Sequence, residues 1–323
     1  RLTLQPKINR SFQAAFHFSE SPIIKIIQKG KNSTMITTFK PKNHFIFDRP
    51  LLTGILIYLG LLICGGFLYH IISTMPLSPV VQAVLNLAAF AIPALLLGLG
   101  VKALIKKGFV LGFTSHKLGK CIQFGALFVL QAAFIVCLHL ITGRPVNLDS
   151  QIVFGAFCAA AAPGFVEELL FRGIVLNNMM RVWAKTPSGL YKALIISSLF
   201  FGLSHISNIL LAGKLTAAIL WQIGYADSFG ILFGAIYLRT RNLWGCIFLH
   251  TLTDFVPYLF SMGLTQKIKS AAATASIVSQ TSVHPIVMIY CSILIFSCLA
   301  IGFYLVRHQK HDEIRACWNL TEM

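Results

Sequence analysis

Long runs of apolar residues dominate this sequence of 323 residues, and eight of them reach about 20 residues or more. A run of that length crosses a bilayer as a helix, because backbone polar groups in lipid must be satisfied within their own segment. The mean hydropathy of +0.75, with 56% hydrophobic and 11% charged residues, excludes an ordinary soluble domain. The sequence therefore predicts an all-α fold, a polytopic membrane bundle of about eight transmembrane helices. The predicted spans are 51–74, 79–104, 121–142, 151–180, 189–211, 215–238, 241–262 and 283–306.

The basic residues occur in alternate loops between these spans, and they account for the net charge of +17. Clusters of Lys and Arg follow the second, fourth, sixth and eighth spans: Lys102, Lys106, Lys107, Lys117 and Lys120; Arg181, Lys185 and Lys192; Arg239 and Arg241; Arg307, Lys310 and Arg315. Cytoplasmic loops carry this excess in membrane proteins, so both termini are predicted to be cytoplasmic. Topology and attraction to an anionic lipid bilayer explain the charge, and no nucleic-acid partner is expected.

Three parts of the chain differ in composition. Residues 1–49 form a basic N-terminal segment, which we expect to be partly disordered or, before Met35, non-native, because no methionine precedes Met35. Residues 50–306 hold the predicted transmembrane domain, with its functional core at 150–260. Residues 307–323 form a cytoplasmic tail.

Charged and titratable side chains lie within several predicted spans. Four of the chain's ten acidic residues do so, together with two histidines and one arginine: Glu167, Glu168, Asp227, Asp254, His205, His250 and Arg172. A charge at the centre of a bilayer costs about 2.5–3.5 kcal/mol, so a shared polar site that offsets the cost is the best explanation. Asp227 has another explanation as well: it can form an interhelical hydrogen bond, or it can contact and position residues of the site without taking part in the chemistry.

Spacing along a helix separates the roles of these residues. Glu168 and Arg172 are four apart, which places them on one face and predicts an ion pair. Glu167 points about 100° away from Glu168 and lacks that partner, which leaves it free to accept a proton. His250 and Asp254 are also four apart and share a face.

At these residues the chain resembles the CAAX protease and bacteriocin-processing (CPBP) family of intramembrane proteases, also called Abi. Three motifs of that family occur in order, in three separate predicted spans. Glu-Glu-x-x-x-Arg matches Glu167 to Arg172, Phe-x-x-x-His matches Phe201 to His205, and His-x-x-x-Asn/Asp matches His250 to Asp254. The resemblance covers roughly residues 150–260.

The resemblance implies an endopeptidase in which Glu167 and His205 activate a water, while His250 and Asp254 bind the oxyanion or the water. Many family members have Asn in place of Asp254, and an ionised Asp cannot donate a hydrogen bond to an oxyanion. Asp254 is therefore expected to be protonated, to orient His250 or to ligate a metal. The same four residues are a plausible ligand set for zinc, yet there is no His-Glu-x-x-His helix, so a zinc-bound and a metal-free mechanism both remain open.

Two other functions use intramembrane polar residues differently. An ion-coupled transporter would show internal repeats or broken helices in matching halves. Pro163-Gly164 is the only such break in the sequence, and we expect it to bend the fourth span and open a water cavity. A non-catalytic immunity or scaffold protein needs no catalytic site. The substrate implied by the resemblance is a peptide or a membrane-anchored protein, and the compact loops favour a bacterial cell membrane.

Overall fold

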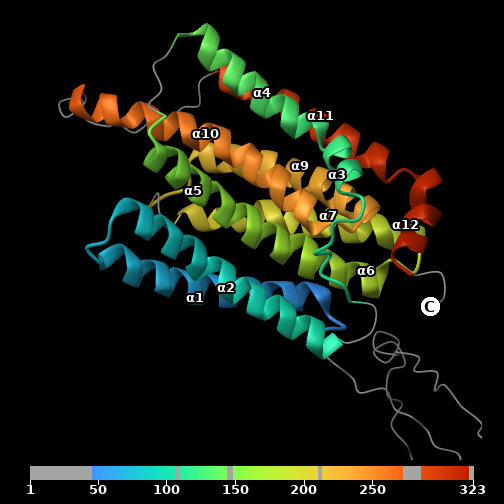
Figure 1. Cartoon of the computed structure of the whole chain (residues 1–323). Helices are drawn as coiled ribbons and strands as arrows, with labels where there is room; N and C mark the ends of the chain where they lie inside the picture. Colours follow the sequence, from blue (N-terminus) through green and yellow to red (C-terminus); the bar gives the residue numbers. More distant parts are fainter. Residues whose placement is uncertain (1–45, 106–108, 144–147, 210–212, 272–284, 320–323) are drawn as a thin grey trace, which may run out of the picture. The chain divides into compact units, whose positions relative to one another are not determined.

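The computed structural model describes residues 46–105, 109–143, 148–209, 213–271 and 285–319, so nearly all of the predicted N-terminal segment lies outside the described residues (Figure 1). Within these ranges every regular element is helical, which confirms the predicted all-α bundle. The elements are α1 (Pro50–Thr74), α2 (Pro79–Ile105), α3 (Leu118–Phe124), α4 (Ala126–Ile141), α5 (Ser150–Glu168), the π-helix η1 (Leu169–Leu176), α6 (Asn177–Trp183), α7 (Pro187–Ser204), the 3₁₀-helix η2 (His205–Asn208), α9 (Ala217–Thr240), α10 (Leu243–Ala271), α11 (Pro285–Leu305), the 3₁₀-helix η3 (His308–Lys310) and α12 (His311–Cys317).

Seven described helices are long and apolar enough to cross a membrane, and an eighth crossing exists only if a bent pair is counted as one span. That pair is the predicted span 121–142, which the structure divides into α3 and α4 with a bend of 63°. The break falls at Gly125, where a Cβ atom would collide with the side chain of Leu249 on α10. The glycine therefore lets the chain approach α10 closely at the point where this span is divided.

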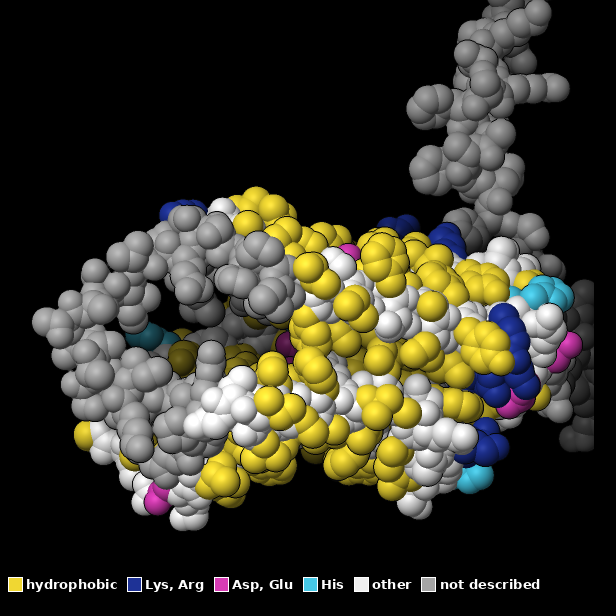
Figure 2. Space-filling model, turned by 90° about the horizontal axis from the view of Figure 1, so that it is seen from above, with side chains coloured by type: hydrophobic (Ala, Val, Ile, Leu, Met, Phe, Trp, Pro, Cys, Tyr) yellow, Lys and Arg dark blue, Asp and Glu magenta, His cyan; other side chains and the backbone are white. Residues whose placement is uncertain are grey.

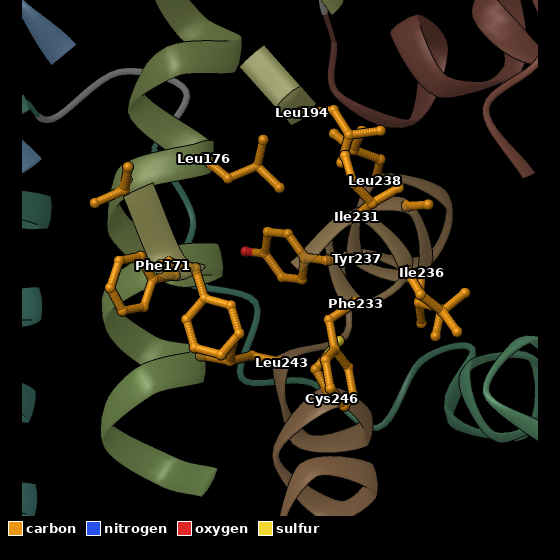
Figure 3. Close-up of a cluster of buried hydrophobic side chains, with 14 of the residues drawn as sticks. Phe171, Leu176, Leu194, Ile231, Phe233, Ile236, Tyr237, Leu238, Leu243 and Cys246 are labelled. Carbon is orange, nitrogen blue, oxygen red and sulfur yellow. The ribbon is translucent and has the colours of Figure 1, made fainter. Parts of the chain in front are cut away.

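The helices that carry the predicted site pack directly on one another. α5 lies beside α10, while α9 lies between α7 and α11; α1 and α2 cover α5 and η1 (Figure 1). α9 is the most enclosed of these seven spans: 61% of its 18-residue apolar stretch is buried inside the bundle. Figure 3 shows part of the core around it, where the Tyr237 ring of α9 points toward the side on which Phe171 of η1 lies. The Tyr237 hydroxyl donates to the Leu111 carbonyl at 3.1 Å, which satisfies its only polar atom inside this core.

The fourth span is a continuous helical run of 34 residues, Ser150–Trp183, and so is longer than one crossing needs, as predicted. Directly after the two glutamates it widens into the π-helix η1, whose residues are all buried. α5 continues through Pro163 and Gly164 to Glu168, so the helix is not interrupted there, and Pro163 lines the same cavity as Glu167. The bend expected at these residues stays a prediction. Gly164 has a packing role: a Cβ atom there would collide with Thr251, so the glycine lets α5 approach α10 closely.

The basic segments meet at one end of the bundle. Arg239 pairs with Glu313 at 2.8 Å, Arg241 donates to the Cys317 carbonyl at 3.3 Å, and Arg315 donates to the Lys185 carbonyl at 3.0 Å. The predicted tail thus contains a helix, α12, that packs on the end of α9. Figure 2 shows Lys and Arg gathered mainly at one end and apolar side chains over most of the rest of this face. A multi-pass membrane protein with its basic loops on one side accounts for this surface, while its orientation stays a prediction.

Candidate active site

Glu168 is the centre of the buried polar cluster. Its side chain, at the end of α5, is fully buried, and Oε1 accepts a hydrogen bond from Arg172 Nη1 at 2.9 Å, which confirms the ion pair predicted from their spacing. The same oxygen accepts from His250 Nδ1 on α10 at 2.8 Å. Because an ionised carboxylate can only accept, Nδ1 of His250 carries the proton. Glu168 therefore orients the imidazole of His250 as well as compensating Arg172, a link that the sequence spacing did not predict.

The other nitrogen of His250 points between two more carboxylates. Nε2 lies 3.8 Å from Glu167 Oε2 and 3.6 Å from Asp254 Oδ2, close enough for strong electrostatic interaction and too far for direct hydrogen bonds. The His250 side chain is only 9% exposed, whereas those of Glu167 and Asp254 are 28% and 30% exposed. Two carboxylates that an incoming molecule can reach thus flank one imidazole nitrogen whose orientation Glu168 holds.

A cavity of about 280 Å³ opens beside Glu167 inside the bundle. Glu167 and His205 both line it, so the structure brings together the two residues predicted to act on water. His205 caps the end of α7, where the chain tightens into the 3₁₀-helix η2. Its Nδ1 lies 3.1 Å from the Phe201 carbonyl, and since a carbonyl only accepts, Nδ1 is the donor. In the neutral ring Nε2 therefore keeps its lone pair.

Aromatic rings pack against the two histidines and Arg172. Phe201 lies between the two histidines, with ring centroids 5.3 Å from His205 and 6.1 Å from His250. His250 stacks on Phe233 at 5.4 Å, and the Arg172 guanidinium lies over the same two rings, 4.5 Å from Phe201 and 5.2 Å from Phe233. Phe201, the first residue of the second motif, contacts both histidines and Arg172 and so positions them together.

Asp227 stands apart from this cluster. It lies on α9 against Gly202 of α7, where any Cβ atom would collide with its carboxylate. Its Oδ1 is buried without a hydrogen-bond partner among the described residues. Asp227 therefore lies behind the turn that carries His205, and Gly202 is required there by contact with it.

Tyr58 of α1 is a site residue that the sequence reasoning missed. It lines the cavity with Glu167 and His205, and its hydroxyl donates to the Ser204 carbonyl at 2.8 Å. That carbonyl belongs to the residue directly before His205. Only its position as a hydroxyl within an apolar span marks Tyr58 in the sequence, and nothing local relates α1 to α7.

Whether these residues fit a metal depends on how many donors converge on one point. The described residues contain no group of three or more His, Cys, Asp and Glu side chains that could hold a metal ion. His250 Nε2 has two carboxylates within 4 Å, but the closest contact of His205 is with a backbone carbonyl. As they stand, the side chains do not form the three-ligand set of a catalytic zinc site.

One known family matches the part of the chain that contains this site. Residues 149–256 match the family model described as Rce1-like, type II CAAX prenyl endopeptidase. The match confirms the predicted family resemblance. It covers about a third of the chain and contains every motif residue from Glu167 to Asp254. No curated protein and no solved structure matches the chain. Over these residues the chain is similar to type II CAAX prenyl endopeptidases.

Proposed function

We propose that this Rce1-like protein is an intramembrane endopeptidase that hydrolyses a peptide bond near the carboxyl terminus of a membrane-anchored substrate, with Glu167 as general base. The observation that carries the proposal is the placement of Glu167, partly exposed, on a cavity that it shares with His205 and beside His250. A carboxylate and an imidazole that line one cavity are suited to hold a water between them.

The first chemical step moves a proton from water to Glu167. His205 Nε2, whose lone pair is free in the neutral ring, accepts a hydrogen bond from the same water and fixes its direction. The oxygen of the water then forms a bond to the carbonyl carbon of the substrate, and the carbonyl oxygen becomes an oxyanion. When the tetrahedral intermediate collapses, the C–N bond breaks and Glu167 returns its proton to the leaving amine.

His250 and Asp254 stabilise the charge that develops on the carbonyl oxygen. With Nδ1 donating to Glu168, a doubly protonated His250 has an N–H on Nε2 to donate to the oxyanion. Asp254 lies 3.6 Å from that nitrogen, so a protonated Asp254 offers a second donor and an ionised Asp254 orients the imidazolium instead. Glu168, Arg172 and Phe201 touch His250 or each other and act by positioning.

The decisive experiment replaces Glu167 with Gln. Purified protein in nanodiscs is incubated with a farnesylated peptide that ends in a CAAX sequence, and the released carboxyl-terminal peptide is measured by mass spectrometry. We expect Glu167→Gln to abolish cleavage, because the amide cannot accept the proton of the water. Folding should be retained, because Glu167 makes no direct hydrogen bond to the buried cluster and part of its side chain is exposed.

A matched control is Asp149→Asn, a carboxylate-to-amide change at the start of α5, far along the same helical run. Asp149 Oδ1 caps the helix by accepting from Gln151 N, and Asn caps equally well. Full activity of Glu167→Gln protein would refute the assignment of the base. Cleavage by neither wild type nor Asp149→Asn would instead show that the farnesylated peptide is the wrong substrate class or that the protein is no peptidase, and it would remove the support for the proposal.

A further inference from the structure

A second and larger cavity adjoins the proposed active site. It measures about 890 Å³ and lies between α2, α5 and α10. Phe90 of α2 and Ala162 of α5 line both this cavity and the one that holds Glu167, so the two spaces are neighbours. Its lining includes Gln82 and Gln151, from the first turns of α2 and α5, and so it extends toward the end of these helices that is opposite the basic end.

Two helices carry rows of residues that lead from one cavity to the other. On α10, Tyr258 follows Asp254 by four residues, as Asp254 follows His250, and Tyr258 lines the second cavity. Residues four apart on a helix share a face, so the row continues from the proposed oxyanion site into the second space. On α2, Gln82, Asn86 and Phe90 form an equivalent row, and all three line the second cavity.

One polar atom of this lining is unsatisfied in the fold. Asn86 Oδ1 is buried without a hydrogen-bond partner among the described residues, and such a group in an apolar environment costs free energy. The lipid-facing groove between α1 and α2, of about 530 Å³, shows the contrast: the part of α2 that lines it supplies Leu96, Leu97 and Leu104. The face of α2 that carries Gln82 and Asn86 can therefore hydrogen-bond to a polar molecule in this cavity.

We propose that the second cavity binds the carboxyl-terminal part of the peptide substrate, the residues beyond the scissile bond that are released by cleavage. The proposal rests on the proposed function. Amide side chains both donate and accept, so Gln82, Asn86 and Gln151 match the N–H and C=O groups of an extended peptide. The cavity of about 280 Å³ at Glu167 is smaller than typical ligand sites, whereas about 890 Å³ lies within their range of roughly 300–1,000 Å³.

The position of the cavity selects which part of the substrate enters it. A folded substrate protein stays in water at the basic end, and only its short carboxyl-terminal segment passes the catalytic residues toward the opposite end. The Phe90 ring packs against Gly65 of α1, where any Cβ atom would collide with it. A peptide that extends from the first cavity into the second passes beside Phe90 and Ala162, which line both.

The kinetic test varies the length of the released segment. Farnesylated peptides with one, two or three residues after the scissile bond are compared, and cleavage is followed by mass spectrometry. Wild type should cleave the three-residue peptide at least tenfold more efficiently than the one-residue peptide. Asn86→Leu, which keeps the size and removes the amide, should raise KM for the three-residue peptide about 3- to 10-fold, the effect of one or two lost hydrogen bonds, and leave the one-residue peptide unchanged.

Leu96→Ala is the matched control, because Leu96 lies on the same helix but lines the groove between α1 and α2. It should leave KM unchanged for both the one-residue and the three-residue peptide. If Asn86→Leu protein folds poorly, Tyr258→Phe serves as a second test of the cavity. Equal effects of Asn86→Leu on all three peptides, or equal cleavage of all three by wild type, would overturn the proposal.

A binding measurement separates this proposal from the proposed function. Glu167→Gln protein in nanodiscs is titrated with a dansylated tripeptide, and fluorescence anisotropy reports the Kd. Binding that Asn86→Leu weakens 3- to 10-fold supports the cavity even if no peptide is cleaved. Absence of binding, or binding that Asn86→Leu does not change, rejects the cavity even if Glu167 proves to be the catalytic base.

Discussion

Glu168→Ala tests the buried cluster most severely, because it removes the carboxylate that pairs with Arg172. The arginine side chain is 2% exposed and Glu168 Oε1 is its carboxylate partner at 2.9 Å. Breaking a buried ion pair by removing one partner costs about 3–5 kcal/mol. The cation–π contacts of Arg172 with Phe201 and Phe233 do not reduce this cost, because they are present both before and after the substitution.

The loss of the His250 hydrogen bond adds to that cost. A buried donor left without its acceptor costs about 1–3 kcal/mol, so the total reaches about 4–8 kcal/mol. Native proteins are stable by roughly 5–15 kcal/mol, so most of the margin would be lost. We expect Glu168→Ala protein to give a low folded yield and to unfold at a much lower fraction of SDS in mixed micelles than wild type.

A double variant distinguishes a stranded charge from a general packing defect. Glu168→Ala combined with Arg172→Met removes the charge and fills much of its volume, so stability should return toward wild type. Activity should stay low, because His250 still lacks the acceptor for Nδ1. The reasoning is refuted if Glu168→Ala protein is as stable as Glu167→Gln protein, or if the double variant is no more stable than the single one.

Three further outcomes are expected. Tyr58→Phe, which removes the hydrogen bond to the Ser204 carbonyl, should lower kcat by up to about tenfold with little change in KM, and steady-state kinetics that show the reverse would argue against a role in positioning His205. Reporter fusions after Lys185 and near Asp149 should read cytoplasmic and external respectively, and an external signal at Lys185 would contradict the predicted orientation. If zinc is bound, a membrane-permeable chelator should abolish cleavage, and elemental analysis should find close to one zinc per chain in wild type and much less in His205→Ala; persistent activity in metal-free protein would establish the glutamate mechanism.

The sequence by itself determined the class of fold and the local parts of the site. Apolar runs of sufficient length can only be membrane helices, and the pitch of a helix places Glu168 on the same face as Arg172 and His250 on the same face as Asp254. These inferences depend on residues within a few positions of one another. Three motifs in separate spans also indicated one shared site, because isolated intramembrane charges are too costly to keep.

Only the tertiary structure decided how those parts meet. The hydrogen bond from His250 to Glu168 joins residues 82 positions apart, and Tyr58 reaches Ser204 across 146 positions. The close approach of Gly125 to Leu249, at the point where the predicted third span is divided, likewise joins distant parts of the chain. Such contacts depend on which helix faces pack together and how closely, and small residues, side-chain volumes and the path of the whole chain determine that packing jointly.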